Sequence, residues 1–172
     1  EGNQRFLLCV DGFPSLKVCI PQIHPLELRV QCASNMKNLW HRLQLYQQVS
    51  ETQPEGPTKT GARIYPPPAE WCAATIRAYE GAGMGDKALM RPHLCPSAGL
   101  GENHYAMNPN CQTDSPADMV LLFETKAGWN QHGGPELFTL DNHDPKGGCV
   151  LLNDGTVRFI RTKEELQQLR WK

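Results

Sequence analysis

The stretch HDPKGGCVLLNDGTVRFI, residues 143–160, carries the strongest local structural signal in the sequence. Asp-Gly between two β-rich runs predicts a hairpin with a two-residue type I′ turn, in which both turn positions need a positive φ. Such a turn predicts a register in which Leu152 faces Val157 and one apolar face meets the core. Asp154 and Gly155 are therefore interpreted as structural turn residues, and a catalytic role for Asp154 is disfavoured.

The loop that precedes this hairpin is rich in oxygen donors. His143 stands among Asp141, Asn142 and Asp144 in the segment LDNHDPKGG. Oxygen-rich loops can hold calcium, although the DxDxDG order of an EF-hand is absent here. A solvated acidic loop with a hydrogen-bonded histidine is the alternative interpretation.

Composition limits the broad class of the protein. The 172 residues carry 17 basic and 18 acidic side chains, so no strongly basic face is expected and nucleic-acid binding has little support. Fourteen prolines and 15 glycines predict a loop-rich chain of short elements. No apolar run approaches the roughly 18 residues that a membrane helix needs, and the chain opens at EGNQRF without a methionine. An anchor upstream of this start is therefore compatible with the sequence.

The seven cysteines allow two readings. No CxxC motif occurs, which disfavours a zinc ribbon or a thioredoxin-type redox pair. Disulfides in an oxidising compartment and ordinary buried thiols both remain open. The odd count leaves at least one thiol free unless another chain supplies its mate. The candidate disulfide cysteines are Cys9, Cys19, Cys32, Cys72, Cys95 and Cys111.

Hydrophobic periodicity places the main elements. Residues 5–20 predict two short strands around the turn DGFP, with Cys9 and Cys19 on opposite arms, and residues 25–30 alternate like a third strand. Helical spacing then begins, and Ser34 is expected to cap the helix. Its apolar face comprises Met36, Leu39, Trp40, Leu43 and Tyr46.

Further elements are predicted downstream of this helix. After a polar Pro/Gly loop, the segment PPPAEWCAATIRAYEGAG predicts a second helix, and DMVLLFET predicts a buried strand. Residues 91–112 are expected to be irregular. Thr162 and Glu165 form a capping box that predicts a short terminal helix.

Motifs of catalysis or transition-metal binding are weak. His93 lies two residues from Cys95, a link too short to indicate a nucleophile and its base. No GxSxG or HExxH motif occurs. His93, His104, His132 and His143 show no ligand spacing, so a zinc site built from them is disfavoured.

Several motifs in order resemble one bacterial family. Cys32 is followed by Asn-Met-Lys-Asn-Leu at a helix start, and Cys95-Pro96-Ser97 is followed by Tyr-Ala-Met-Asn at 105–108. A buried strand ending in Glu124 comes next, and then a histidine before an Asp-Gly pair. Together these resemble pseudopilin-related proteins, similar to the major pseudopilin of type II secretion, with a C-terminal "His, nine residues, Asp-Gly" segment. The resemblance covers roughly residues 32–161.

The chain departs from this family in two places. Ten residues, not nine, separate His143 from Asp154, and β-like residues stand where the family has a prepilin-type apolar helix. Either the anchor lies upstream of residue 1 or a small strand module has replaced it.

The resemblance implies a fold and a division of the chain. The expected fold is α+β and pilin-like, with an N-terminal amphipathic helix packed on an antiparallel sheet, many loops and a C-terminal β-hairpin. Residues 1–31 would be a β-rich extension and residues 32–172 the pseudopilin-like globular domain. Major pseudopilins bind calcium in a C-terminal loop, which implies Ca²⁺ ligands among Glu124, Asp141, Asn142 and Asp144. Cys95 would be structural and paired with Cys32 or Cys72.

The function implied is non-enzymatic. The chain would be a component of a bacterial secretion or surface-filament system, with other pseudopilin or secretion-machinery subunits as partners. It would be periplasmic or on the cell surface, anchored in the inner membrane in the full-length protein. The alternative is an extracytoplasmic ligand- or protein-binding domain that reuses the pilin fold, with the 50–68 and 127–147 loops as its contact surface.

Overall fold

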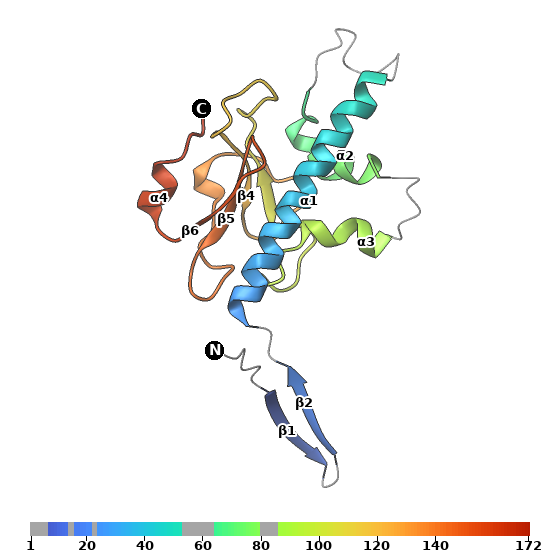
Figure 1. The fold of residues 1–172 in the computed structure, drawn as a ribbon, viewed down its shortest axis with the longest axis vertical. Coiled ribbons are helices and arrows are strands. Elements are labelled where there is room, and N and C mark those ends of the chain that lie inside the picture. The colour runs from blue at the N-terminus through green and yellow to red at the C-terminus, as the bar shows by residue number, and fades with distance from the viewer. Residues whose placement is uncertain (1–6, 14–15, 22–23, 53–63, 80–85) are drawn as a thin grey trace.

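A computed structural model of the chain describes residues 7–13, 16–21, 24–52, 64–79 and 86–172. The helices are α1 (Pro25–Thr52), α2 (Trp71–Arg77), α3 (Asp86–Met90) and α4 (Lys163–Gln167), with 3₁₀ turns at Pro68–Glu70, Arg91–His93 and Pro135–Leu137. The strands are β1 (Leu7–Phe13), β2 (Leu16–Pro21), β3 (Tyr105–Met107), β4 (Val120–Glu124), β5 (Gly148–Leu152) and β6 (Val157–Ile160). The fold is α+β, as the sequence predicted (Figure 1). The predicted polar loop after α1 falls largely on residues 53–63, outside the described residues.

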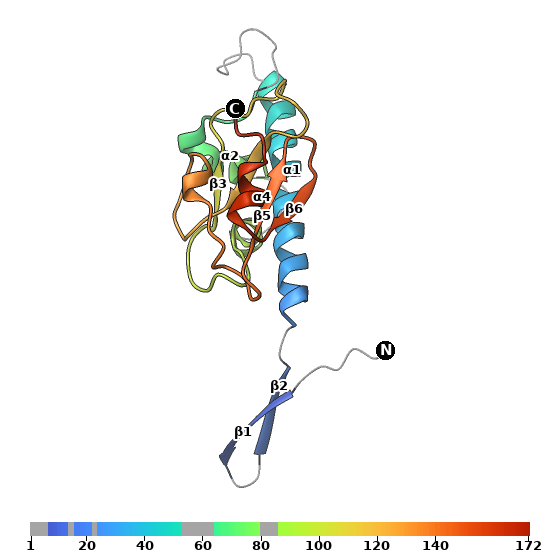
Figure 2. The ribbon, with the colours of Figure 1, turned by 90° about the vertical axis from the view of Figure 1, so that its left-hand side faces the viewer.

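The body of the protein is built on a four-stranded antiparallel sheet of order β3-β4-β5-β6. Every residue of β4 and β5 is buried, which explains their continuous apolar sequence. One face of the sheet packs against α1 and α2, and the other packs against the C-terminal segment that contains α4 (Figures 1 and 2). Two apolar layers therefore enclose the central strands.

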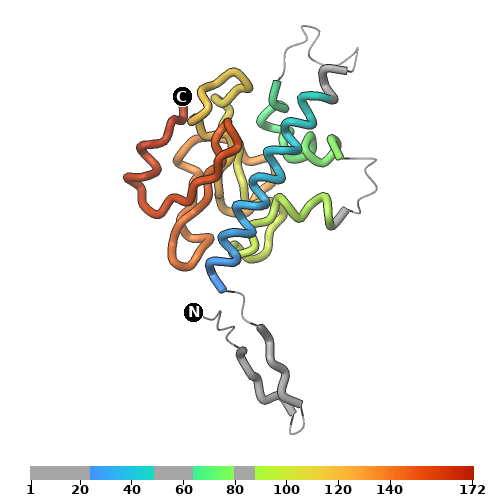
Figure 3. The backbone as a smooth tube through the Cα atoms, viewed as in Figure 1, coloured from blue at the N-terminus to red at the C-terminus, as the bar shows by residue number. Residues whose placement is uncertain are grey.

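Helix α1 crosses one face of the sheet, as the backbone trace shows (Figure 3). Cys32, Met36, Leu39 and Leu43 are fully buried, at a spacing that places them along one side of the helix. The predicted apolar face is thus confirmed at Met36, Leu39 and Leu43, and it extends back to Cys32. No helix in the described ranges combines the length and the apolar character needed to cross a membrane.

The start of α1 corrects two expectations. Residues 25–30 are helical and not a third strand, because Pro25 opens the helix and the carbonyl of His24 accepts hydrogen bonds from Glu27 and Leu28. Ser34 is therefore inside the helix and does not cap it. The expected boundary between residues 31 and 32 falls within α1.

The C-terminal hairpin is present, but its predicted turn and register were wrong by one residue. Leu151, not Leu152, pairs with Val157. The amide of Leu152 donates to the carbonyl of Thr156, and the amide of Gly155 donates to the carbonyl of Leu152, which makes a three-residue turn. Within this turn only Gly155 has a positive φ, of 83°. Asp154 stabilises the turn by accepting a hydrogen bond from the Thr156 amide, and its own φ is not positive.

Other expectations are settled by the element boundaries. The second helix, the buried strand β4 and the terminal helix α4 are confirmed, and Thr162 caps α4 by accepting from the Glu165 amide. Residues 91–112 are not wholly irregular, because they contain the 3₁₀ turn at Arg91–His93 and strand β3. Strand β3 has three residues, too few for alternation to reveal it in the sequence.

Candidate functional site

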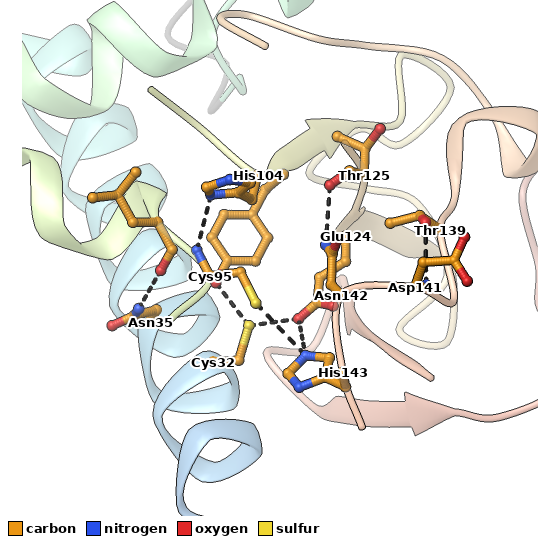
Figure 4. A network of polar contacts seen from close by, with 12 residues as sticks. Cys32, Asn35, Cys95, His104, Glu124, Thr125, Thr139, Asp141, Asn142 and His143 are labelled. Carbon is orange, nitrogen blue, oxygen red and sulfur yellow. Dashed lines mark hydrogen bonds and ion pairs between the residues drawn. The ribbon is translucent and has the colours of Figure 1, made fainter. Parts of the chain in front are cut away.

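Five reactive side chains meet between α1 and the sheet. Cys32 comes from α1, Glu124 is the last residue of β4, and Cys149 lies in β5. His143 comes from the loop before β5, and Cys95 from the loop after the 3₁₀ turn at 91–93. We call these five residues the buried cluster; Figure 4 labels Cys32, Cys95, Glu124 and His143. Each is at most 5% exposed to solvent.

The sheet register turns two of these side chains toward α1. Glu124 pairs with Tyr105, and Tyr105 belongs to the core that α1 covers, so Glu124 shares that face. Cys149 pairs with Phe159 on the same side. The β4–β5 register, with Leu122 opposite Leu151, puts Cys149 on the same face as Glu124, beneath α1.

Short contacts connect the cluster (Figure 4). The Cys32 thiol donates to Glu124 Oε1 at 2.5 Å, closer than an ordinary hydrogen bond. The same oxygen lies 3.0 Å from Nε2 of His143, and that nitrogen is 3.7 Å from the sulfur of Cys95. The hydroxyl of Tyr105 is 3.0 Å from the sulfur of Cys32. One oxygen of Glu124 thus joins helix, sheet and loop.

Two polar atoms of the cluster are left without a partner. Oε2 of Glu124 and Nδ1 of His143 are buried and have no hydrogen-bond partner among the described residues. Buried polar atoms are nearly always paired, since desolvation without compensation costs roughly 1–3 kcal/mol, and more for a charged group. The cluster is therefore incomplete as a set of hydrogen bonds.

The contacts shift the ionisation of the cluster in opposite directions. Burial, hydrogen bonds to Cys149 and Cys95 and the charge of Glu124 raise the pKa of the Cys32 thiol far above its ordinary value. The hydrogen bond from Cys32, helped by His143 and opposed by burial, lowers the pKa of Cys95 to about 6. Burial alone would lower the pKa of His143, but Cys95 and Glu124 raise it to about 10. These shifts favour an imidazolium at His143 beside a thiolate at Cys95.

The structure disperses the four oxygen donors predicted for calcium. Glu124 faces the thiols, and exposed Asp141 forms an ion pair with Lys146 at 2.8 Å. The amide of Asn142 donates to the Thr125 carbonyl, and Asp144 is exposed. From the sequence, His143 was not expected to be a ligand in this loop. In the structure it is the residue of the loop whose side chain joins the buried cluster.

The cysteines predicted to form disulfides have varied placements. Cys32, Cys72, Cys95 and Cys111 are free buried thiols, as is Cys149. Cys9 and Cys19 are register partners in the β1–β2 hairpin, as expected from their positions on opposite arms. Cys72 and Cys111 lie in the core outside the cluster.

The four histidines considered together as zinc ligands do not all lie at one site. His93 is buried against Trp71 and Trp129, and burial together with the charge of Arg42 lowers its pKa to about 3. His104 accepts a hydrogen bond from the Cys95 amide. Among these histidines only His143 belongs to the cluster.

The cluster brings nitrogen, oxygen and sulfur donors together in a closed space. A thiol beside an imidazole is a pair found in nucleophilic enzymes, and both Cys95 and His143 are buried among the described residues. Sequence reasoning missed the assembly because Cys32 and Glu124 are 92 residues apart. No protein-family model, curated protein or solved structure matches this chain.

Proposed function

We propose that this chain is a non-enzymatic, pseudopilin-like component of a bacterial secretion or surface-filament system, acting outside the cytoplasm. In this proposal α1 is the assembly helix and the sheet is the head that it carries. The full-length protein would be held at the inner membrane by a segment outside the described residues. Other pilin-like subunits, including further copies of this chain, would be its partners.

The observation that carries this proposal is the exposed apolar start of α1. Leu26 and Val30 are 55% and 62% exposed and stand one helical turn apart on the same side. The helix is 28 residues long, and its first turns extend beyond the sheet (Figure 2). Exposed apolar residues aligned on a projecting helix provide a surface for a second helix. Pilin-type assembly needs such a helix-to-helix contact.

The buried cluster supports the non-enzymatic part of the proposal. Its five side chains connect α1 to strands β4 and β5 and to two loops. A buried cluster at this junction stabilises the attachment of the helix to the sheet, and each of its side chains is at most 5% exposed. Its position therefore suits a structural role.

One observation favours the second candidate function, an extracytoplasmic ligand- or protein-binding domain. Strands β1 and β2 pair just before α1, where a pseudopilin would continue its apolar helix. A hairpin at this position interrupts that continuity. In this case the 127–147 loop, which leads to the cluster, is the candidate contact surface.

Site-specific photo-crosslinking in cells that produce the full-length protein distinguishes the two. A photoreactive residue at position 26 or 30 should give crosslinks to a second copy of this chain or to another pilin-like chain, identified by mass spectrometry. The same residue at position 164, on the exposed face of α4, is the control and should give none of these products. Only monomer at positions 26 and 30, or equal products at 164, would contradict the assembly function and favour the binding domain.

A further inference from the structure

Four residues of the buried cluster have the chemistry and the separation of metal ligands. The sulfurs of Cys32 and Cys149, a ring nitrogen of His143 and a carboxylate oxygen of Glu124 all lie within 4.8 Å of one another. A tetrahedral zinc ion holds such donors about 2.0–2.3 Å from the metal, which separates them by roughly 3.3–3.8 Å. The four donors are therefore already gathered at nearly the right spacing.

The unpartnered atoms point independently to a missing occupant. Glu124 is fully buried, yet its Oε2 has no partner among the described residues. The hydrogen bonds of Cys32 and His143 satisfy only Oε1. A cation at this place would balance the negative charge of the buried carboxylate. The hydrogen bonds within the cluster offset the cost of burying that charge only in part.

We propose that Cys32, Cys149, His143 and Glu124 form a structural site for one divalent transition-metal ion, with zinc as the expected metal. Two thiolates, an imidazole and a carboxylate form a mixed donor set that suits zinc and excludes calcium or magnesium, which take oxygen ligands only. The proposal does not depend on the assembly function and adds a ligand to the junction between α1 and the sheet.

Binding requires a small expansion of the cluster and the release of protons. The sulfur of Cys32 and Oε1 of Glu124, now 2.5 Å apart, must separate by roughly 1 Å to span a metal. Cys32 and Cys149 must each lose a proton and His143 must become neutral, because all three coordinate as deprotonated groups. Metal uptake should therefore release protons and weaken as the pH falls.

Two neighbouring groups would support the ligands without binding the metal. The Tyr105 hydroxyl, 3.0 Å from the Cys32 sulfur, can donate to the thiolate. The Cys95 sulfur lies 3.7 Å from the His143 nitrogen and stands outside the set of four. Such outer partners orient the ligands, and their loss typically weakens metal affinity about 10–100-fold.

Cobalt(II) added to the reduced, chelator-treated 172-residue chain tests the site. We expect saturation at one equivalent, the visible bands of tetrahedral cobalt, and a sulfur-to-cobalt charge-transfer band with the intensity of two thiolates. Zinc should displace the cobalt at one equivalent. Absence of the charge-transfer band from wild-type protein with free thiols would overturn the proposal, and so would a disulfide between Cys32 and Cys149 in protein purified without reductant.

Single substitutions assign the ligands. Cys32→Ser and Cys149→Ser should each halve the charge-transfer intensity and weaken zinc binding by more than about 100-fold, beyond the effect of an outer partner. Cys111→Ser removes a buried thiol outside the cluster and should change neither measurement. Cys95→Ser should keep the two-thiolate spectrum. A full spectrum in Cys32→Ser, or the loss of one thiolate in Cys95→Ser, would overturn this ligand set.

Discussion

Helix α1 is attached to the sheet at two places that differ in chemistry. At the hairpin turn, the Trp40 indole donates to the Asn153 carbonyl at 3.2 Å and lies over Gly155. The side chain of Asn153 accepts from Tyr65 and donates to the Ser115 carbonyl. At the buried cluster, Cys32 contacts a carboxylate whose second oxygen is buried and has no partner in the part of the chain that the structure describes.

This difference shows which of the two attachments has its polar groups hydrogen-bonded without a ligand. The hairpin contact combines apolar packing with satisfied polar groups, so it needs nothing further. The cluster has gathered thiols, an imidazole and a carboxylate whose mutual hydrogen bonds do not satisfy all of them. At the cluster, unpartnered buried atoms coincide with four gathered metal-ligating side chains, so a ligand is expected there and the two attachments should respond differently to metal.

The largest effect is expected at Glu124. Glu124→Ala in zinc-saturated protein should lower the free energy of unfolding by about 3–5 kcal/mol, because it breaks a buried charged network. With chelator the loss should be smaller by about 2.7 kcal/mol, the stabilisation that zinc at 100 times its Kd gives the wild type. Urea unfolding with zinc and with chelator measures both. Glu102→Ala, at an exposed glutamate, is the control. An equal loss with and without zinc would contradict the distinction between the attachments.

A smaller effect, independent of metal, is expected at the hairpin turn. Gly155 has a φ of 83°, and an added Cβ would meet the Trp40 ring at 3.0 Å. Gly155→Ala should therefore lower the free energy of unfolding by about 2 kcal/mol through backbone strain and this contact. Gly99, with a φ of 82° and nothing within 4 Å of an added Cβ, is the matched control and should lose only about 1 kcal/mol.

Urea unfolding of these two glycine variants with zinc and with chelator completes this test. Their losses should be the same under both conditions. Equal losses in the two variants would show that the Trp40 contact contributes nothing. A loss at Gly155 that changes with zinc would show that the two attachments are coupled.

The smallest effect is the response of the metal-free cluster to pH. The pKa of His143 is raised from 6.5 to about 10, so its stabilisation is complete below pH 6.5 and is lost as the pH rises toward 10. The pKa of Cys95 is lowered from 9.0 to about 6, so its stabilisation is complete above pH 9 and is lost as the pH falls toward 6. The opposite slopes cancel between about pH 6.5 and 9.

The free energy of unfolding that the cluster contributes should therefore be flat across this range and decrease on both sides. NMR titration of the His143 ring in chelator-treated protein provides the direct measurement. The ring should stay protonated from pH 6 to 8 and become neutral when zinc is added at pH 7. A midpoint near 6.5 without metal would contradict the ion pair with Cys95.

Local pattern was sufficient for part of the fold. The spacing of Met36, Leu39 and Leu43 predicted the helix face, and the apolar run ending at Glu124 predicted a strand, because burial repeats at short intervals along the chain. The hairpin was predicted but not its register. An Asp-Gly pair fits a two-residue or a three-residue turn, and Asp154 settles the choice through a hydrogen bond that periodicity does not reveal.

The candidate site required long-range information. Cys32, His143 and Glu124 each drew attention in the sequence for separate reasons, but no spacing rule joins residues that meet only after the sheet has formed. Cys149 was merely the odd thiol. Its side chain reaches the cluster through the pairing of β5 with β4, in which Leu151 lies opposite Leu122.

The position of Cys32 has a mechanical consequence. It lies two helical turns after the start of α1, between the projecting part of the helix and the part that packs on the sheet. If neighbouring subunits pull on the projecting turns, the tension reaches the body near this residue, where Arg29 also stacks on Phe159 of β6. A metal bound there would tether the helix to β4 and β5 by coordinate bonds, and would resist the peeling of the helix where packing against the sheet has only begun.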